Sequence, residues 1–457
     1  MTWEDEIMLT GKRVTVIGSG KSGISAAKLL LRHQAVVTIY DSKEETDQER
    51  VRNLLAAECR IVCGAWTEEL TTTTELVIIS PGVPTDLPFL LALKEQGIPI
   101  WGEIELAYVC SRGKRVGITG TNGKTTTTAL TGEILRQYYP EVFVVGNIGI
   151  PYTDKADETT DSSVTVAELS SFQLETIHTF CPDVSMILNI TPDHLNRHHT
   201  MENYIGAKWN VTKNQTKQQV CVLNYEDPIL RERAGGLSAA VVWFSSRRRL
   251  EQGIFLEQGK ILYRKEGVET EILGTDELHI IGLHNYENAM AAIAAAVALG
   301  VPLSAIRAGL RSFRAVEHRI EYVATKKGVD YYNDSKGTNP DAAIKGIQAM
   351  NKPTLLIGGG YDKGSEYDEW IESFDGKVKH LVLIGQTKEK IAEAAKRHKM
   401  PSVICLETFR EAMEFCEKHA APGDAVLLSP ACASWGMFSD YEERGRRFKE
   451  YVHQIQE

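Results

Sequence analysis

Residues 115–126, RVGITGTNGKTT, decide the fold of this chain of 457 residues. The first five form a short apolar run that predicts a buried strand. The glycine-rich turn GTNGKT at 120–125 follows, and a helical stretch comes after it. In such a turn, backbone N–H groups close around phosphate oxygens, a lysine (Lys124) reaches the terminal phosphates and a hydroxyl (Thr125) ligates Mg²⁺. The stretch therefore predicts a phosphate loop of shortened spacing, in preference to a glycine-rich turn that only caps a helix.

Short β-rich runs alternate with amphipathic helical stretches on both sides of this loop. The alternation predicts βαβ units, and therefore an α/β fold with mostly parallel sheets. At roughly 100–200 residues per domain, the length predicts three domains. We expect a Rossmann-like domain at 1–107, a central P-loop ATPase-like domain at 108–314 and a Rossmann-like C-terminal domain at 315–457. The expected strands are 12–17, 35–40, 76–79, 115–119, 163–167, 184–190, 219–223, 329–333, 354–357, 381–384, 403–406 and 425–428, and an alanine-rich helix is expected at about 286–299.

Composition and charge exclude several classes of protein. The formal net charge is −10, which argues against a nucleic-acid binder, because such proteins carry a basic domain. The eight cysteines include no C-x-x-C pair, and the N-terminus has no basic signal region, so we expect reduced thiols and a cytoplasmic location. The apolar helical stretch 289–301 is too short to span a bilayer, so no membrane insertion is expected.

A second glycine cluster, GSGKSG at 18–23, stands at another strand-to-helix turn, and Asp41 ends the next expected strand. The spacing matches the dinucleotide fingerprint, but any anion at that helix N-terminus would fit it. It favours a nucleotide or sugar-nucleotide at the first domain. The alternative is an NAD-dependent oxidoreductase, in which the phosphate loop would have no role.

Polar residues follow the expected strands of the central domain, where open α/β sheets bind ligands. Glu168 follows 163–167, and His194 follows 184–190. With Thr125 they predict a hard-metal site beside the phosphates. The alternatives are a helix N-terminal carboxylate for Glu168 and a structural role for His194. We expect His198–His199 to be solvated loop residues.

The third domain repeats this arrangement of polar residues after strands. Lysines and hydroxyls there suit the recognition of carboxylate and phosphate, although each lysine alone is also compatible with a surface charge. The segments are DSK at 334–336, TNP at 338–340, GGGYDK at 358–363 and SPACASW at 429–435.

These pieces occur in the order typical of the Mur ligases, and the chain resembles that family. The shared motifs run from residue 17 to about 448 and are IGSGKSG, YDS, SPGVP, TGTNGKTT, VGNIG, ELSSFQLE, NITPDHLNRH, GLHNYENAMAA, EHRIE, NDSKGTNPDA and LSPACASWGMF. NDSKGTNP resembles the members that add D-glutamate, since siblings that add L-alanine or a diamino acid carry a D-Y-A-H type segment there. A folylpolyglutamate synthetase, the alternative ligase, would begin close to the phosphate loop.

The resemblance implies an ATP-dependent amide ligase of peptidoglycan precursor synthesis. It would add D-glutamate to UDP-N-acetylmuramoyl-L-alanine through an acyl phosphate, with ATP, two Mg²⁺ ions and a carbamylated lysine at Lys208. We expect the chain to act as a monomer on small-molecule substrates. From the residues alone, Lys208 in the helical stretch ENYIGAKWNVT has the pattern of a solvated surface lysine, and the resemblance reverses that interpretation. A non-catalytic regulator that binds the nucleotide-sugar is the remaining alternative of a different class.

The resemblance also implies residue roles. The UDP-sugar would contact Gly18, Ser19, Gly20, Lys21, Ser22, Asp41, Gly82, Val83 and Asn147. ATP would contact Gly120, Thr121, Asn122, Gly123, Lys124, Thr125, Thr126, Asn285, Asn288, Arg319 and Asp334. D-Glutamate would contact Lys336, Thr338, Lys363, Ser434, Trp435 and Tyr441. The metal ions would be held by Thr125, Glu168, His194 and Lys208, and catalysis would depend on Lys124, Glu168, His194, Lys208 and Lys336.

Overall fold

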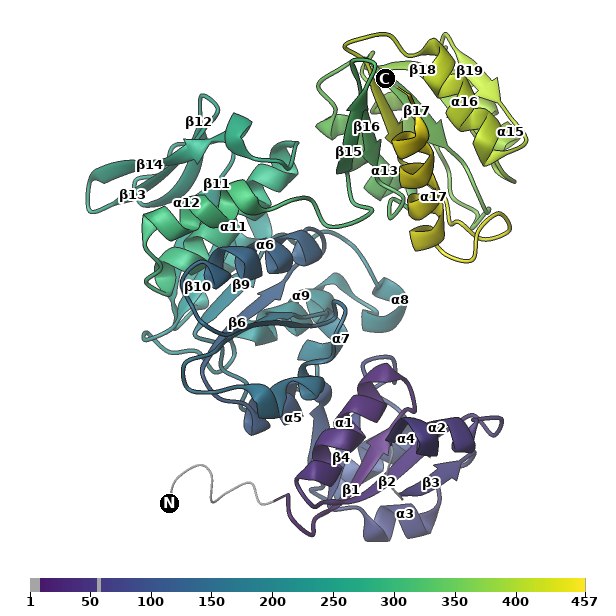
Figure 1. Cartoon of the computed structure of the whole chain (residues 1–457). Helices are drawn as coiled ribbons and strands as arrows, with labels where there is room; N and C mark the ends of the chain where they lie inside the picture. Colours follow the sequence, from purple (N-terminus) through teal and green to yellow (C-terminus); the bar gives the residue numbers. More distant parts are fainter. Residues whose placement is uncertain (1–8, 56–58, 457) are drawn as a thin grey trace. The chain divides into compact units, whose positions relative to one another are not determined.

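The computed structural model describes residues 9–55 and 59–456. The chain divides into two compact units (Figure 1). Unit 1 comprises Met1–Leu273 and Glu287–Leu310, and unit 2 comprises Gly274–Tyr286 and Arg311–Glu457. Unit 1 contains two sheets and unit 2 contains one.

The first sheet of unit 1 has five parallel strands in the order β3-β2-β1-β4-β5. Because the chain turns back beside β1 to form β4, the loops after these two strands meet at a topological switch point, where such sheets bind ligands. The strands are β1 (Arg13–Ile17), β2 (Val36–Asp41), β3 (Arg60–Cys63), β4 (Leu76–Ile79) and β5 (Ile100–Gly102). The helices are α1 (Lys21–Arg32), α2 (Gln48–Leu55), α3 (Glu68–Thr73), α4 (Pro88–Glu95) and α5 (Glu103–Cys110).

The second sheet has nine strands in the order β14-β13-β12-β11-β10-β9-β6-β8-β7. Its strands are β6 (Lys114–Thr119), β7 (Val142–Gly146), β8 (Val164–Glu168), β9 (Val184–Ile187), β10 (Val220–Asn224), β11 (Ala240–Ser245), β12 (Gly253–Glu257), β13 (Lys260–Lys265) and β14 (Val268–Gly274). Pairing is parallel from β7 to β12 and becomes antiparallel between β12 and β13. β9 ends at Ile187, three residues before the expected end, because the chain there turns to support the phosphate loop through Leu188 N and Asn189 O.

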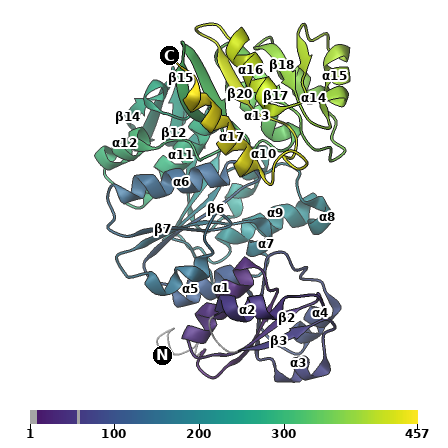
Figure 2. The ribbon, with the colours of Figure 1, turned by 45° about the vertical axis from the view of Figure 1, so that its right-hand side comes forward.

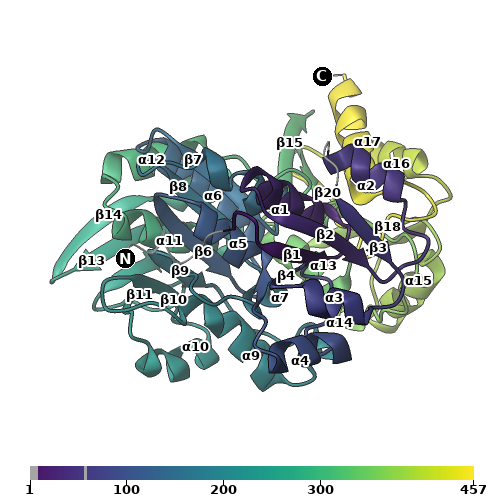
Figure 3. The ribbon, with the colours of Figure 1, turned by 90° about the horizontal axis from the view of Figure 1, so that it is seen from below.

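Helices cover this second sheet. Figure 3 shows α6 (Lys124–Arg136) beside β7 and β8, which it contacts. The other helices are α7 (Ser171–Leu174), α8 (Leu195–His198), α9 (Met201–Trp209), α10 (Pro228–Arg233), α11 (Leu283–Ala298) and α12 (Leu303–Ser312), with 3-10 turns at Tyr152–Asp154, Ala156–Glu158, Asn210–Thr212, Ala234–Gly236 and Thr275–Glu277. The alanine-rich helix that the sequence predicts is α11.

Within unit 1 the two sheets share a core. α1 lies beside α5 (Figure 2) and packs against the 3-10 turn Tyr152–Asp154. Polar contacts extend this packing: Ser25 Oγ lies 2.5 Å from Asp154 Oδ1, and Arg32 Nε donates to Asp157 Oδ2 at 2.6 Å. One cluster of buried side chains runs from Val14 of β1 to Leu223 of β10.

Unit 2 is built on a six-stranded sheet of order β15-β16-β20-β17-β18-β19. Among the described strands of this sheet, only the edge strand β15 runs antiparallel to its neighbour. The elements are β15 (Glu321–Lys326), β16 (Val329–Asn333), α13 (Pro340–Ala349), β17 (Thr354–Gly358), α14 (Asp368–Glu372), β18 (Val378–Leu383), α15 (Lys388–Arg397), β19 (Val403–Cys405), α16 (Phe409–His419), β20 (Ala425–Leu428) and α17 (Tyr441–Gln454). Alternate residues of β17 and β20 enter two separate apolar clusters, so both faces of the sheet are buried.

The α/β class with mostly parallel sheets is confirmed. The domain boundaries at 107/108 and 314/315 stay predictions. The sequence did not predict the segment β12–β14, in which β12 and β13 pair antiparallel and charged side chains alternate with apolar ones in β13 and β14.

Candidate functional site

The phosphate loop leaves the C-terminal end of β6 and enters α6. The predicted loop residues at 120–126 lie between the end of that strand and the first turn of the helix. Gly120 has φ of 151° and Gly123 has φ of 85°, values that strain any residue with a Cβ atom. Lys124 Nζ donates to the carbonyl oxygens of Gly120 at 2.9 Å and Thr121 at 3.0 Å. The ammonium thus lies across the loop, where phosphate oxygens would be bound.

A neighbouring segment and α11 support this loop. Asn122 N donates to Asn189 Oδ1 at 2.8 Å. A Cβ atom on Gly123 would lie 2.4 Å from Asn288 Oδ1, which accepts a hydrogen bond from Thr127 Oγ1 at 3.2 Å. Asn288 therefore lies beside the loop, and its contact with ATP stays a prediction. Asn285, three residues earlier on α11, is buried and donates from Nδ2 to Ile281 O at 2.8 Å.

Glu168 is the last residue of β8, and in the register of the sheet it stands opposite Ile118 of β6. Its side chain is buried, and Oε1 accepts a hydrogen bond from Asn147 Nδ2 at 2.8 Å. Oε2 is also buried and has no hydrogen-bond partner among the described residues. A buried carboxylate oxygen without a donor is costly, so a cation at this position would stabilise it. Glu168 therefore fits a metal ligand beside the phosphate loop.

His194 has φ of 52° and stands at the N-cap of α8. Its Nε2 lies 3.4 Å from Asp193 Oδ2, its ring centroid lies 5.0 Å from that of Phe172, and half of its side chain is exposed. Among residues 9–55 and 59–456, no group of three or more His, Cys, Asp or Glu side chains is arranged to hold a metal ion. A metal centre here would therefore need other oxygen ligands, such as a hydroxyl or a modified lysine.

Lys208 is buried, with a relative exposure of 2%. Its Nζ donates to Gly120 O at 2.7 Å and lies 4.7 Å from the ring centroid of Tyr204. Burial, and then the positive charge of Lys124, lower its pKa to about 6. The interpretation of Lys208 as a solvated surface lysine is therefore wrong: α9 turns this side chain toward the phosphate loop.

His198 is also buried, which corrects the expectation of a solvated loop residue. Its Nε2 lies 2.9 Å from Ser171 Oγ, and its Nδ1 lies 3.2 Å from Glu175 Oε1. Burial lowers the pKa of His198. His199, in contrast, is exposed as expected.

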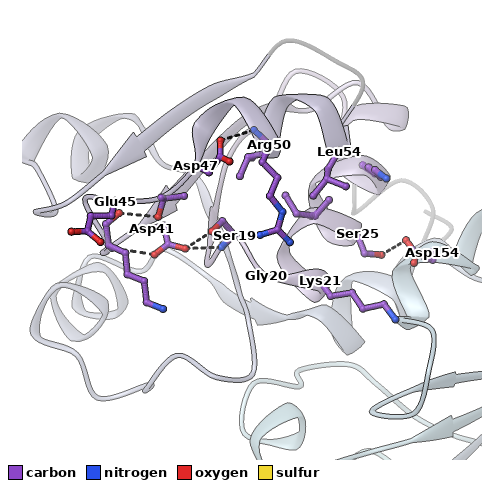
Figure 4. A pocket seen from close by; sticks show the side chains of 15 residues that line it. Ser19, Gly20, Lys21, Ser25, Asp41, Glu45, Asp47, Arg50, Leu54 and Asp154 are labelled. Atoms are coloured by element: carbon purple, nitrogen blue, oxygen red, sulfur yellow. Dashed lines mark hydrogen bonds between the residues drawn. The ribbon is translucent and has the colours of Figure 1, made fainter. Parts of the chain in front are cut away.

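The glycine cluster of the first sheet borders a cavity of about 820 Å³ (Figure 4). Ser19 donates to Asp41 Oδ2 from its backbone nitrogen at 3.0 Å and from its hydroxyl at 2.5 Å. Burial raises the pKa of Asp41, but the hydrogen bonds from Ser19 and Lys43 bring it below its ordinary value. Lys21 Nζ donates to Gly149 O in the GNIG segment. Figure 4 shows Arg50 extending from α2 toward the Ser19–Gly20 turn.

Sequence reasoning missed Lys43 and Arg50 as lining residues of this cavity. Acidic and basic residues are mixed in the segment SKEETDQERVR after Asp41, so the sequence carries no distinct signal for these two side chains. Gly20 is the N-cap of α1 and Ser22 lies in its first turn, so these predicted residues stand at the expected helix N-terminus.

The turn at 80–83 packs on the glycine cluster. Val83 N donates to Ser80 O at 3.0 Å, and a Cβ atom on Gly18 would lie 2.8 Å from Ser80 Oγ. Gly82 lies inside this turn. The residues after β1, β2 and β4 that are predicted to contact the UDP-sugar therefore lie together at the C-terminal ends of these strands.

In unit 2, Asp334 is buried at the end of β16. It accepts hydrogen bonds from Ser429 Oγ at 2.6 Å and from Ile320 N at 3.3 Å. Burial raises its pKa to about 7, although the Arg319 charge acts in the opposite direction. The Arg319 Nε atom is buried without a hydrogen-bond partner among the described residues. Arg319 and Asp334 thus lie close enough to interact, and their contact with the nucleotide stays a prediction.

The residues predicted to contact the amino acid form two groups in unit 2. Lys336 Nζ lies 5.5 Å from the ring centroid of Tyr441, and Thr338 N donates to Lys336 O at 2.9 Å. Lys363 Nζ lies 4.5 Å from the ring centroid of Trp435, whose side chain is exposed. Ser434, next to Trp435, is buried and caps the following turn through its carbonyl oxygen. Each group presents a cation beside an aromatic ring, which suits a carboxylate ligand.

Comparison with known proteins finds three domain families along the chain. Mur ligase MurD-like N-terminal domain matches residues 12–102, Mur ligase middle domain matches 118–296, and Mur ligase glutamate ligase domain matches 318–432. UDP-N-acetylmuramoylalanine--D-glutamate ligase of Lachnoclostridium phytofermentans is 58% identical over 98% of this chain and 99% of its own length. The protein of the same name from Lachnospira eligens is 53% identical over 98% of this chain and 100% of its own length.

Solved structures share the fold at lower identity. UDP-N-acetylmuramate-alanine ligase MurC of Thermotoga maritima is 20% identical, with a TM-score of 0.59 over 97% of this chain and all of that chain. MurF of Acinetobacter baumannii is 18% identical, with a TM-score of 0.60 over 96% of this chain and 93% of that chain. In the described part of the chain, no helix has the length and apolar character needed to cross a membrane. The matches of more than half identity over nearly the full length establish that the chain belongs to the Mur ligase family.

Proposed function

We propose that this chain is an ATP-dependent ligase that joins D-glutamate to UDP-N-acetylmuramoyl-L-alanine in peptidoglycan precursor synthesis. The full-length relatives of that name, up to 58% identical, carry this assignment. The observation that supports the chemistry is the phosphate loop with Lys124 across it and the unpartnered Oε2 atom of Glu168 on the adjacent strand.

The reaction requires activation, because a free carboxylate has a poor leaving group. The carboxylate oxygen of the L-alanine residue attacks the γ-phosphorus of ATP, and the bond to ADP breaks. The amine of D-glutamate then attacks the acyl carbon of the resulting acyl phosphate, phosphate leaves and the nitrogen loses a proton. Lys124 would move from the Gly120 and Thr121 carbonyl oxygens to the transferring phosphate and stabilise its charge.

Bound Mg²⁺ would supply positive charge that screens the phosphate oxygens. We propose that two Mg²⁺ ions bind here. Thr125 and Glu168 would hold one ion, and His194 and Lys208 would hold the other. Glu168 supports this proposal most directly, since its buried Oε2 atom lacks a donor. Lys208 suits a carbamate, because a neutral amine at neutral pH can react with CO₂, and the product is an anionic oxygen ligand suited to a hard cation.

The carbamate has its own test. Lys208→Ala is expected to lower the rate at least about a hundredfold, near 2.7 kcal/mol. Added short-chain carboxylates should restore part of the activity, because they supply the missing oxygens. Near-normal turnover of the variant would refute a ligand role. A carbon-13 carbamate signal from labelled bicarbonate that appears in the wild type and is lost in Lys208→Arg would support the modification, and its absence in the wild type would refute it.

The other substrates follow from the remaining parts of the site. We propose that the cavity lined by Ser19, Gly20, Lys21 and Asp41 holds the UDP-sugar, together with the neighbouring Gly18, Ser22 and Gly82-Val83, and that Asn147 contacts the sugar-peptide substrate. We propose that Arg319 and Asp334 bind the nucleotide from unit 2. The residues proposed to contact D-glutamate are Lys336, Thr338, Lys363, Ser434, Trp435 and Tyr441. The boundaries 1–107, 108–314 and 315–457, a monomeric state and a cytoplasmic location belong to the same proposal.

The decisive experiment is phosphate release from ATP in the presence of UDP-N-acetylmuramoyl-L-alanine and a panel of D- and L-amino acids. We expect release with D-glutamate and little with the others. Release with L-alanine or a diamino acid instead would assign another ligase of the family. Binding of the UDP-sugar without any phosphate release would favour a non-catalytic regulator.

A further inference from the structure

The partly buried side chain of Arg197 links the segment that carries His194 to Glu175 and to the turn at 80–83. Arg197, in α8, donates from Nη2 to the carbonyl oxygen of Val83 at 2.9 Å and to Glu175 Oε2 at 2.9 Å. The two charged side chains are only 17% and 18% exposed. A charge-assisted pair with so little solvent contact holds its geometry more firmly than a surface pair.

Glu175 anchors α8 at a second point. Its Oε1 atom lies 3.2 Å from Nδ1 of the buried His198. The Phe172 ring stacks on His198 with a centroid distance of 5.4 Å, and the Arg197 guanidinium lies 5.2 Å from the centroid of Phe172. His194 is the N-cap of α8, so the position of this short helix determines where its imidazole lies.

The Val83 carbonyl that accepts from Arg197 belongs to a turn beside the glycine cluster of the first sheet. Val83 closes a turn that begins at Ser80, whose side chain packs against Gly18 of the glycine cluster. Pro81 and Gly82 form the middle of this turn, and residues of these types at these positions favour it. A fixed Val83 carbonyl therefore fixes the backbone that we assign to the UDP-sugar.

We propose that Arg197, held by Glu175, is a positioning residue that sets the bound UDP-sugar in register with His194 and the phosphate loop. The inference rests on the proposed function. Its physical reason is that the acceptor carboxylate must be delivered to the γ-phosphate over the full length of a sugar-nucleotide. Small misplacements of reacting atoms are enough to slow such a step strongly.

The test compares four variants in steady-state kinetics. Arg197→Ala is expected to raise the KM for UDP-N-acetylmuramoyl-L-alanine and to lower kcat, each by about tenfold, while the KM values for ATP and D-glutamate change less than about twofold. Arg197→Lys should recover part of both losses. The KM and kcat of Glu175→Gln should lie between those of Arg197→Lys and the wild type. Arg233→Ala is the matched control, because Arg233 pairs with the largely exposed Glu202 in the same unit and should behave as the wild type.

Direct binding separates this inference from the proposed function. Calorimetry with the UDP-sugar alone should show an affinity about tenfold weaker for Arg197→Ala than for the wild type, even if the wild type released no phosphate. An unchanged affinity and acceptor KM in Arg197→Ala would overturn the inference. Equal rises in all three KM values with a lowered melting temperature would also overturn it, because they would show only a structural role. Failure of the wild type to use D-glutamate would instead overturn the proposed function.

Discussion

Replacing Lys208 by methionine is expected to stabilise the folded chain near neutral pH, although it should abolish activity. Lys208 is 2% exposed and donates a hydrogen bond to Gly120 O. Burial and the Lys124 charge lower its pKa from 10.5 to about 6. Methionine has a similar length and flexibility and carries no charge, so it should fill the same space.

The sign and size of the expected change in the free energy of unfolding follow from the pKa values of Lys208 in the folded and unfolded chain. The folded pKa lies below the unfolded one, so folding favours the neutral amine. Near pH 7.5 the unfolded chain holds the proton and the folded chain has lost it, which costs about 1.4 kcal/mol for each of about three pH units, or about 4 kcal/mol. The cost is greatest below about pH 6 and disappears above about pH 10.5. Loss of the hydrogen bond to Gly120 opposes the gain by about 1 kcal/mol, which leaves about 3 kcal/mol.

Urea unfolding in bicarbonate-free buffer measures this difference near pH 7.5 and near pH 9.5. The Lys208→Met variant should be more stable by about 3 kcal/mol at the lower pH and nearly equal to the wild type at the higher pH. Lys217→Met, which changes an exposed lysine in the same unit, should show neither effect. A variant of Lys208 that is less stable than the wild type near pH 7.5, or a difference that does not change with pH, would refute the reasoning.

Three further outcomes are expected. Lys124→Ala should remove most phosphate release while UDP-sugar affinity, measured by calorimetry, stays within about tenfold; a larger loss would contradict the assignment of the two ligands to separate sites. Lys363→Ala should raise the KM for D-glutamate far more than that for the UDP-sugar, and equal rises would show a general structural or nucleotide contact. Gly23→Ala should weaken UDP-sugar binding and lower the melting temperature, because the added Cβ atom would lie 1.9 Å from Gly18 O; an unchanged affinity would show that the cluster does not bind that ligand.

Local sequence patterns predicted the parts of the fold that depend on local chemistry. Apolar runs marked most of the parallel strands, and the two glycine clusters marked the turns at the ends of β1 and β6. These signals are readable because a buried strand and a phosphate-binding turn each need particular residue types in consecutive positions. The strands β12–β14 were not predicted because their apolar runs are only two or three residues long and are bordered by charged residues, as in KILYRK.

The alternation of strand and helix patterns in the sequence indicated the α/β class, and the motifs along nearly the whole chain indicated the family. Only the tertiary structure decided which polar side chains are buried. Lys208 and His198 have the sequence context of surface residues, yet segments from Gly120 and from Ser171–Glu175 cover them. Arg197 likewise pairs with Glu175, more than twenty positions away, and donates to the carbonyl of Val83, more than a hundred positions away. Burial and pairing depend on which distant elements pack together, and a local pattern holds no information about those partners.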